Sequence, residues 1–231
     1  MKLPISNRLL ACCNYVNQDD RVADVGCDHG YLSIYLLTHS IARSAIASDV
    51  NEQPLLSAVH NAEKFGVRDR MEFYLSDGIR NIPRDFTVMV CAGLGADTMI
   101  SILESAPWLK NKRYRLILQC QSKTPTLRRY LSESGWRIAE ESTVRDGKFL
   151  YTVMEVWWEP EYPRLTPGQW YFSPALLENA APEVPKYYRR VRNSLRLSAA
   201  HREDAETRQA LSELEALARD PNLRFLTEDE T

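Results

Sequence analysis

Apolar and polar positions follow a regular alternation of two patterns from residue 20 to about residue 158. Short apolar runs, typical of strands buried in a parallel sheet, lie at Val22–Val25, Ala45–Val50, Met71–Leu75, Phe86–Ala92 and Arg115–Gln119. Between these runs, apolar residues recur at helical spacing in Tyr31–Leu37, Gln53–Phe65, Thr98–Leu103 and Thr126–Glu133. Repeated alternation of strand and helix predicts an α/β fold whose parallel sheet is covered by helices on both faces.

The pattern changes after the fifth strand-like run. The segment WRIAEESTVRDGKFLYTVMEVWW contains two strand-like runs joined by Asp146-Gly147, a dipeptide that favours a hairpin turn. We therefore predict an antiparallel hairpin that closes the sheet, whereas a dinucleotide dehydrogenase would continue with parallel crossovers. Six of the twelve prolines then lie between Pro160 and Pro185, which predicts a connector or an irregular packing segment. Helical spacing in Lys186–Ala218 predicts two helices packed as an antiparallel hairpin.

Composition narrows the class of protein only slightly. The chain has 29 Lys and Arg against 31 Asp and Glu, so overall charge does not point to nucleic acid, and only a local patch stays open. The cysteines form no C-x-x-C pair and lie mostly in apolar contexts, at Cys12, Cys13, Cys27, Cys91 and Cys120. They predict buried, reduced thiols and no metal site. Because no apolar signal core or membrane-length run is found, we expect a cytoplasmic protein without a membrane partner.

The turn after the first strand-like run carries the first candidate chemistry. It reads Gly26-Cys27-Asp28-His29-Gly30, so a ligand there would meet backbone N–H groups at a helix N-terminus and the carboxylates of Asp24 and Asp28. A dinucleotide-binding turn would need G-x-G-x-x-G, and a carboxylate at this point disfavours a phosphate. S-adenosylmethionine fits better, because it has cationic ammonium and sulfonium groups, a carboxylate and no phosphate.

Two further acids follow the next two strand-like runs. Asp49 ends the second run, where a carboxylate can accept hydrogen bonds from both ribose hydroxyls. Asp77 follows the third run, where it can accept from the adenine amino group while Gly78 or Ile79 offers a backbone N–H. Each residue alone has an ordinary explanation, because Asp before Gly is common in turns and His29 could simply begin a helix. Acids at three successive strand ends together indicate a cofactor site more strongly.

Three segments resemble the bacterial tRNA (adenine-22-N1)-methyltransferase family, namely ADVGCDHGYLSIYL, CAGLGADTMISIL and RLILQCQSKTPTLRRYLSESGWRIAEESTVRDGKFLYTVMEV. ISNRLL near the N-terminus is similar to the family's opening helix, and the resemblance covers nearly the whole chain. It implies a Rossmann-like class I methyltransferase sheet, a small helical C-terminal module, and methylation of adenine N1 in the D-loop region of tRNA. By position, the implied S-adenosylmethionine site contains Asp24, Gly26, Asp28, Asp49, Asp77 and Gly93, to which the turn chemistry adds His29 and Gly78.

The chain departs from the family's pattern in two places. After the fourth strand it reads Ala92-Gly93-Leu94-Gly95-Ala96 instead of A-G-M-G-G, and Ala96 adds a Cβ near the expected target-base pocket. The fifth strand ends in Gln119-Cys120-Gln121, where the family tends to have Gln-Pro-Asn. These changes leave the expected cofactor residues in place and bear on the choice of target.

The same turn indicates which adenine nitrogen is methylated. Enzymes that methylate the exocyclic amine carry an Asn/Asp-Pro-Pro-aromatic turn after the fourth strand, which this sequence lacks. Ring nitrogen N1 already has an in-plane lone pair, so methyl transfer to it needs positioning more than a strong base. We expect in-line transfer from the sulfonium to N1 of an adenine flipped out of its stack. Asp28 and Asp97 are the candidate catalytic residues, because a carboxylate can stabilise the cationic product base.

A candidate RNA-binding surface lies in the C-terminal segment. Tyr187 and Tyr188 are interleaved there with a run of basic residues, namely Lys186, Arg189, Arg190, Arg192, Arg196 and Arg202. A second basic group lies in LKNKRYR, which ends at Arg115. Each group is a candidate for phosphate binding, and each could instead be a solvated helix or loop surface.

These inferences divide the chain into an S-adenosylmethionine-binding domain at residues 1–159 and a helical module at residues 160–231 that binds tRNA. The leading function is methylation of adenine N1 in tRNA. A small-molecule methyltransferase and an RNA-binding protein that has lost turnover are the alternatives, and the basic C-terminal run argues against the former. The sequence makes no prediction of which tRNAs are accepted or of the oligomeric state.

Overall fold

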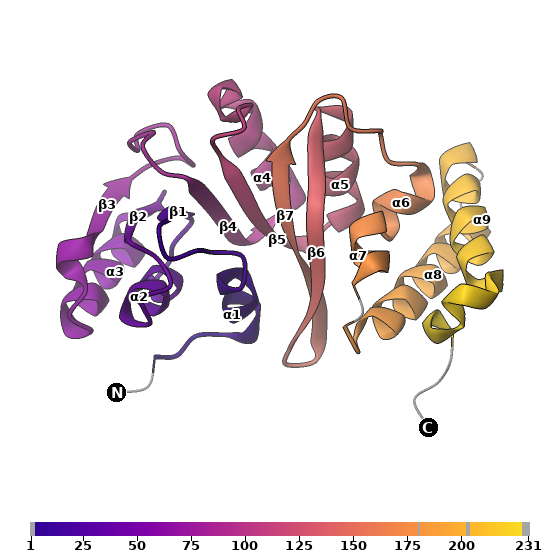
Figure 1. Cartoon of the computed structure of the whole chain (residues 1–231), viewed down its shortest axis with the longest axis horizontal. Coiled ribbons are helices and arrows are strands. Elements are labelled where there is room, and N and C mark those ends of the chain that lie inside the picture. The colour runs from indigo at the N-terminus through magenta and orange to yellow at the C-terminus, as the bar shows by residue number, and fades with distance from the viewer. Residues whose placement is uncertain (1–2, 180, 202–203, 228–231) are drawn as a thin grey trace.

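A seven-stranded sheet forms the centre of the computed structural model, which describes residues 3–179, 181–201 and 204–227 (Figure 1). The strands follow the order β3-β2-β1-β4-β5-β7-β6 across the sheet. They are β1 (Arg21–Val25), β2 (Ser44–Asp49), β3 (Met71–Leu75), β4 (Val88–Gly95), β5 (Arg115–Ser122), β6 (Trp136–Asp146) and β7 (Phe149–Trp158). Strands β1 to β5 pair in parallel, and β7 is antiparallel to both of its neighbours. The predicted parallel sheet with an antiparallel C-terminal hairpin is therefore confirmed.

Helices cover both faces of the sheet. They are α1 (Asn7–Cys13), α2 (Tyr31–Thr38), α3 (Glu52–Lys64), α4 (Ala96–Glu104) and α5 (Thr124–Glu133), with short 3-10 turns η1 (Arg68–Arg70) and η2 (Pro107–Leu109). Alternate strand residues point to the two faces, so Val22 packs in the layer of α1, α2 and α3 while Ala23 and Val25 pack in the layer of α4 and α5. Burial on both faces explains why the parallel strands are apolar throughout.

Strands β4 and β5 extend beyond their predicted ends at Ala92 and Gln119. β4 continues to Gly95 and β5 to Ser122, and their pairing persists through a register irregularity around Leu94. Within this irregular stretch Gly93 has φ +82°, a conformation that glycine adopts without strain. The end of β4 therefore lies at the carboxyl edge of the sheet next to the end of β1, where a Cβ on Gly26 would come within 3.4 Å of the Leu94 side chain.

The C-terminal part forms a helical layer next to the hairpin, seen at the orange and yellow end of Figure 1. It contains α6 (Pro167–Tyr171), α7 (Pro174–Glu178), α8 (Val184–His201), α9 (Ala205–Arg219) and η3 (Pro221–Leu226). α8 and α9 pack together as predicted, and the Tyr188 hydroxyl on α8 donates to the Leu214 carbonyl on α9. Their buried cluster includes Leu150 of β7, so these helices also pack against the sheet. The division of the chain at residues 159 and 160 stays a prediction.

The proline-rich segment is more regular than the sequence indicates. Its helices α6 and α7 begin at Pro167 and Pro174, and each proline follows a capping residue, Thr166 or Ser173. Proline at the first helical position removes an N–H that would have no partner inside the helix. The prolines here therefore mark helix starts as well as breaks between helices.

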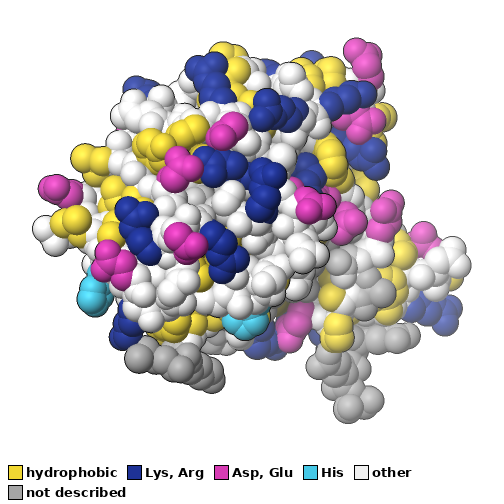
Figure 2. Space-filling view, turned by 60° about the vertical axis from the view of Figure 1, so that its left-hand side comes forward, with side chains coloured by type: hydrophobic (Ala, Val, Ile, Leu, Met, Phe, Trp, Pro, Cys, Tyr) yellow, Lys and Arg dark blue, Asp and Glu magenta, His cyan; other side chains and the backbone are white. Residues whose placement is uncertain are grey.

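Three predictions from composition concern buried thiols, membrane segments and metal. All five cysteines are unpaired and buried, as predicted, and burial raises the pKa of the Cys13 thiol to about 12. Within the described ranges, no helix combines the length and apolar character of a membrane span. The same residues contain no cluster of three or more His, Cys, Asp or Glu placed to hold a metal ion. On the face seen in Figure 2, Lys and Arg side chains are interspersed with Asp and Glu.

Candidate active site

A cavity of about 690 Å³ lies at the carboxyl ends of β1, β2, β3 and β4. Its wall contains seven of the predicted site residues, namely Gly26, Asp28, Asp49, Asp77, Gly78, Gly93 and Asp97. Asp24 and His29 are not among its described lining residues. The cavity therefore brings together the acids that follow three successive strands, which is the arrangement expected for a ligand at the edge of an open α/β sheet.

Positive backbone angles shape the turn after β1. Gly26, Asp28 and Gly30 have φ values of +73°, +50° and +72°. The backbone N–H groups of Gly26 and Cys27 both donate to the Ser48 carbonyl at 2.9 Å, which ties the turn to β2. Asp28 takes the left-handed conformation without being glycine, a local strain of the kind found at functional sites. Its side chain lies in the open cavity, with 71% of it exposed.

Asp49 is the most buried of the described acids of the cavity wall, and its residue is only 8% exposed. Its Oδ2 accepts from the Asp28 N–H at 3.1 Å, and its Oδ1 accepts from the Asn51 N–H at 2.9 Å. These two bonds fix the plane of the carboxylate at the end of β2. A carboxylate has about four acceptor positions, so the remaining ones can accept hydroxyl groups of a ligand.

Asp77 and Gly78 form the cavity wall that follows β3. The Asp77 carboxylate is 70% exposed and lies 3.6 Å from Arg80 Nε, a loose ion pair at the surface. Gly78 has φ +61°, and a Cβ there would come within 2.9 Å of Ile102 Cγ1 on α4. Glycine thus allows the chain to pass close to α4 while Asp77 stays free to meet a ligand.

Asp24 lies beneath the turn rather than on the cavity wall. Its carboxylate accepts from Ser33 Oγ on α2 at 2.8 Å, and the residue is 4% exposed. Burial raises the pKa of Asp24 to about 6, the charge of Asp49 acts in the same direction, and the hydrogen bonds from Ser33 oppose them. The position joins β1 to α2, so its contact with a cofactor stays a prediction.

His29 lies just before α2, next to the cavity residue Asp28. Its ring is 46% exposed, with Nε2 3.5 Å from Asp28 Oδ1, and its carbonyl accepts from Asn61 Nδ2 at 3.0 Å. Its contact with a cofactor stays a prediction.

Arg8 on α1 is a cavity residue that the sequence analysis missed. Its Nη1 donates to Gln119 Oε1 at 3.4 Å, and its Nε lies 3.4 Å from Asp146 Oδ2. The same Gln119 oxygen accepts from the Gly93 N–H at 3.0 Å, and a Cβ on Gly93 would collide with the Arg8 guanidinium. Among the described residues of the wall, which include four Asp, Arg8 is the one cation. Arg8 lies in the segment ISNRLL, but its partner Gln119 is more than a hundred residues away, so no local sequence pattern indicates the contact.

Asp97 lies at the far rim of the cavity, in the first turn of α4. Its Oδ2 is 2.6 Å from Lys123 Nζ, and both side chains are largely exposed, at 69% and 62%. Ala96, the small residue that departs from the family's glycine, is fully buried under this turn. Its Cβ therefore packs into the core and does not fill the cavity.

Several basic residues of α8 contact other groups of the protein. Arg190 Nη1 donates to the Leu150 carbonyl at 3.1 Å, the Arg192 guanidinium lies 5.4 Å from the centre of the Tyr188 ring, and Arg196 Nη2 is 2.9 Å from Glu215 Oε1. Lys186 is exposed and Arg189 is half-buried. Arg202 lies outside the described residues. The run is thus a partly neutralised helix face, and its contact with RNA stays a prediction.

In the second basic group, Arg115 is not available to RNA, and the expectation for it is wrong. Its side chain is 12% exposed and forms ion pairs with Asp20 and, at 2.7 Å, with Glu155. Because it pairs β5 with β7 and with the segment before β1, it holds the sheet together. Lys110 and Arg113 stay near the surface, each over an aromatic ring, Trp158 and Tyr114 respectively.

Comparison with known proteins agrees with this geometry. A sequence family described as "Methyltransferase domain" matches residues 5–154. A tRNA (adenine(22)-N(1))-methyltransferase of Bacillus subtilis is 28% identical over 154 residues, 66% of this chain and 65% of that protein. A protein of Mycoplasma pneumoniae named as a candidate tRNA methyltransferase is 33% identical over 159 residues, 66% of this chain and 71% of that protein.

A solved structure is similar over a longer stretch. It is a candidate tRNA (m1A22) methyltransferase of Streptococcus pneumoniae in complex with S-adenosyl-L-methionine, with 29% identity and a TM-score of 0.80. The superposition covers 91% of this chain and 99% of that one. The sequence matches are shorter, since this chain spans 65% of the Bacillus subtilis protein and 61% of a Mycoplasma genitalium relative. By its methyltransferase domain and these relatives, the chain belongs to the bacterial tRNA (adenine-22-N1)-methyltransferase family.

Proposed function

We propose that this protein transfers a methyl group from S-adenosylmethionine to N1 of an adenine in tRNA, at position 22. The observation that carries the proposal is one cavity lined by Asp28, Asp49 and Asp77 from three successive strand ends, with Arg8 on the same wall. This set of groups matches a ligand with two cationic centres, several hydroxyl and amino donors and a single carboxylate. It does not match a dinucleotide, whose phosphates the four acids would repel.

Each polar group of the cofactor has a partner in this proposal. Asp49 accepts from the ribose hydroxyls, because two backbone N–H groups already orient its carboxylate. Asp77 accepts from the adenine amino group, beside the backbone of Gly78. Asp28 faces the ammonium, and Arg8 binds the carboxylate as an extended, permanently charged donor. The bound cofactor supplies a methyl group activated by its sulfonium charge.

The protein's part in methyl transfer is positioning and charge stabilisation. N1 of adenine needs no proton removed before it attacks, so the cavity has to hold the base in line with the transferred methyl group. Gly93 and the half-buried Leu94, at the end of β4, line the cavity, and in this proposal a flat base lies against them. Asp97 and Asp28 then stabilise the positive charge that the methylated base acquires.

The RNA reaches this site through the C-terminal part of the chain. We assign tRNA binding to the helical layer of residues 160–231, with Lys186, Arg189, Arg190, Arg192 and Arg196 as phosphate contacts. Arg190 keeps donors for a phosphate, because a guanidinium carries five N–H groups and its bond to the Leu150 carbonyl uses one of them. A tRNA substrate and five unpaired cysteines fit the cytoplasm.

Transfer of labelled methyl from S-adenosylmethionine, offered in parallel to bulk tRNA and to a metabolite extract, tests the proposal. We expect label in tRNA alone, and N1-methyladenosine at position 22 when the product is mapped by mass spectrometry. A transcript with guanine at that position should accept no label. Label in the metabolites alone would identify a small-molecule methyltransferase, and cofactor binding without any transfer would identify an RNA-binding protein that has lost turnover.

A further inference from the structure

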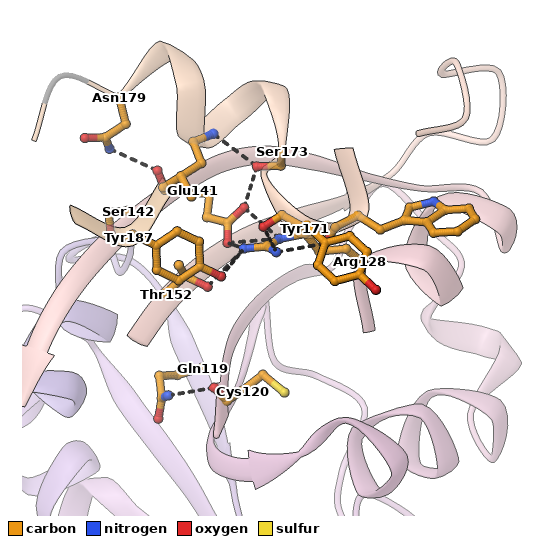
Figure 3. Close-up of polar contacts among 12 residues, drawn as sticks. Gln119, Cys120, Arg128, Glu141, Ser142, Thr152, Tyr171, Ser173, Asn179 and Tyr187 are labelled. Carbon is orange, nitrogen blue, oxygen red and sulfur yellow. Dashed lines mark hydrogen bonds and ion pairs between the residues drawn. The ribbon is translucent and has the colours of Figure 1, made fainter. Parts of the chain in front are cut away.

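A second cavity, of about 360 Å³, lies between the sheet and the C-terminal helices. Figure 3 shows four residues of its wall, Cys120, Thr152, Tyr171 and Tyr187. They come from β5, β7, α6 and α8, so the cavity exists only where the methyltransferase sheet meets the helical layer. Ligand sites in proteins occupy roughly 300–1,000 Å³, so this one has room for a single nucleotide and not for a double helix.

The charges around the second cavity are positive. Lys123 and Arg190 line it, and its described lining residues include no Asp or Glu. Arg190 is exposed and has one Nη1 hydrogen bond, to the Leu150 carbonyl at 3.1 Å, which orients the guanidinium and leaves other N–H groups for a ligand. Asp97 faces Lys123 from the neighbouring cavity and offsets part of its charge. The cavity therefore favours an anion.

The rest of the wall offers aromatic surface. Tyr151, Tyr171 and Tyr187 all contribute to it. Tyr187 is rigid, because its hydroxyl accepts from Arg128 Nη2 at 3.2 Å and its ring packs with Phe172. Tyr151 is half-exposed at the start of β7, where a base could stack on its ring. Aromatic rings beside cations are the usual surface for an unpaired nucleotide, because every base has a flat face for stacking and every nucleotide carries a phosphate.

The two cavities adjoin each other. Asp97 lines the cofactor cavity and Lys123 lines the second cavity, and the two side chains are 2.6 Å apart. An adenine that enters the first cavity must leave its stack, which also unstacks its neighbours in the RNA. We propose that the second cavity binds one unpaired nucleotide next to the target adenine, with its base on Tyr151 and its phosphate on Arg190. This inference rests on the proposed function and adds a specific contact that holds the flipped strand.

Affinity for tRNA, measured with purified variants of the full chain, tests this assignment. Tyr151→Leu and Arg190→Gln should each raise the Kd for tRNA about tenfold, as expected for a lost stacking or phosphate contact. Tyr151→Phe keeps the ring and should bind like wild type. Arg208→Gln is the matched control, because it removes one exposed arginine from α9, outside the cavity. S-adenosylhomocysteine binding and the thermal midpoint should stay unchanged in all four variants, which shows that they fold.

Transcripts with an abasic residue on either side of adenine 22 identify the base. At one of the two positions, loss of the base should weaken binding by wild type about tenfold, and Tyr151→Leu should add no further loss. Equal losses from Tyr151→Leu on intact and abasic RNAs would overturn the stacking assignment, as would wild-type affinity in both cavity variants. If adenosine 5′-monophosphate alone binds as tightly as tRNA, the cavity is a site for free nucleotides.

These outcomes are separable from the proposed function. A wild-type protein that methylates tRNA while Tyr151→Leu and Arg190→Gln bind it normally would overturn the second cavity's role and the phosphate contact assigned to Arg190, and would leave methylation of tRNA standing. A wild-type protein that neither binds nor methylates tRNA would overturn both.

Discussion

Arg128 and Glu141 form an ion pair whose two side chains are completely buried, with 2.6 Å between Arg128 Nη2 and Glu141 Oε1 (Figure 3). Arg128 Nη1 also donates to the carbonyls of Trp170 and Tyr171, at 2.9 and 3.0 Å, and Ser173 Oγ donates to Glu141 at 2.5 Å. The pair thus connects α5 and β6 with the start of the helical layer. Burial of Arg128 disfavours its charge, but the adjacent carboxylate prevails and raises the pKa of the guanidinium.

Removal of one member of this pair should destabilise the protein strongly. Arg128→Met leaves the Glu141 carboxylate buried without its counter-ion, so we expect the free energy of unfolding to fall by about 3–5 kcal/mol. Denaturant titration of the purified variant measures this loss. The double variant Arg128→Met/Glu141→Leu should recover part of it, because no unpaired charge then remains. A loss below about 1 kcal/mol in the single variant would show that water or a rearrangement satisfies Glu141.

The same network limits what truncation can reveal. A chain that ends near Glu159 loses Trp170, Tyr171 and Ser173, which together satisfy much of the Arg128 and Glu141 hydrogen bonding. Such a chain would expose a buried ion pair, and its failure to fold would say nothing of RNA binding. Single surface substitutions are therefore the better test of the helical layer.

The raised pKa of Asp24 predicts how stability depends on pH. Folding raises the pKa of this carboxyl from 3.8 to about 6, so the folded state holds the proton more tightly than the unfolded state does. The contribution of Asp24 to stability is then fully present below pH 4 and is lost as the pH rises through 6. Asp24→Asn cannot titrate, so wild type should lose roughly 2–3 kcal/mol relative to this variant between pH 4 and pH 7. Urea titrations of both proteins at several pH values measure the free energy of unfolding. The same dependence of this free energy on pH in both proteins would contradict the prediction.

Much of the fold follows from the sequence because the central strands are buried on both faces. Their apolar runs stand out, and the bounds of β1 and β2 each lie within one residue of the predicted ones. The prediction is less good where the apolar pattern stops before the pairing does, as at Gly95 in β4. The sequence analysis does not single out Arg128, because a charged residue in an amphipathic helix is usually exposed to solvent and its partner Glu141 lies 13 residues later on β6.

Charge on α8 should contribute to tRNA affinity beyond the second cavity. Lys186→Gln and Arg189→Gln together remove two charges and preserve helix propensity. If both residues contact phosphates, the slope of log K against log salt should flatten by roughly 0.7–0.9 for each of them. Filter binding over a range of salt concentrations measures the slope. Arg208→Gln/Arg224→Gln is a control of equal charge on exposed positions of α9 and η3. An equal change of the salt slope in the two double variants would mean that tRNA affinity depends on net charge and not on these positions of α8.

The candidate site was predicted unevenly, for a physical reason. Asp49 and Asp77 follow strands directly, and strand ends meet at one edge of a parallel sheet, so local spacing was enough to place them on the cavity. Asp24 also lies on a strand, but its side chain is on the face of the sheet that α2 covers, where it accepts a hydrogen bond from Ser33. Arg8 reaches the cavity only because α1 packs beside Gln119, a contact between residues 111 positions apart.

Arg8 gives the sharpest test of how the cofactor is held. If its guanidinium binds the cofactor's carboxylate, Arg8→Met should raise the Kd for S-adenosylmethionine and for S-adenosylhomocysteine by about 10- to 100-fold. Hydrogen bonds to charged groups contribute about 1.5–3 kcal/mol, which corresponds to this change. Binding of 5′-methylthioadenosine, which lacks the amino-acid group, should not change.

The matched comparison for Arg8 is Asp49→Ala. 5′-Methylthioadenosine and the two ligands with an amino-acid group all carry the ribose, so this variant should raise the Kd for each of them by about tenfold or more. Isothermal titration calorimetry of wild type and the two variants with each of the three ligands gives the dissociation constants needed. A loss of 5′-methylthioadenosine binding in Arg8→Met would mean that Arg8 shapes the cavity through Gly93 and Gln119 instead of binding the carboxylate.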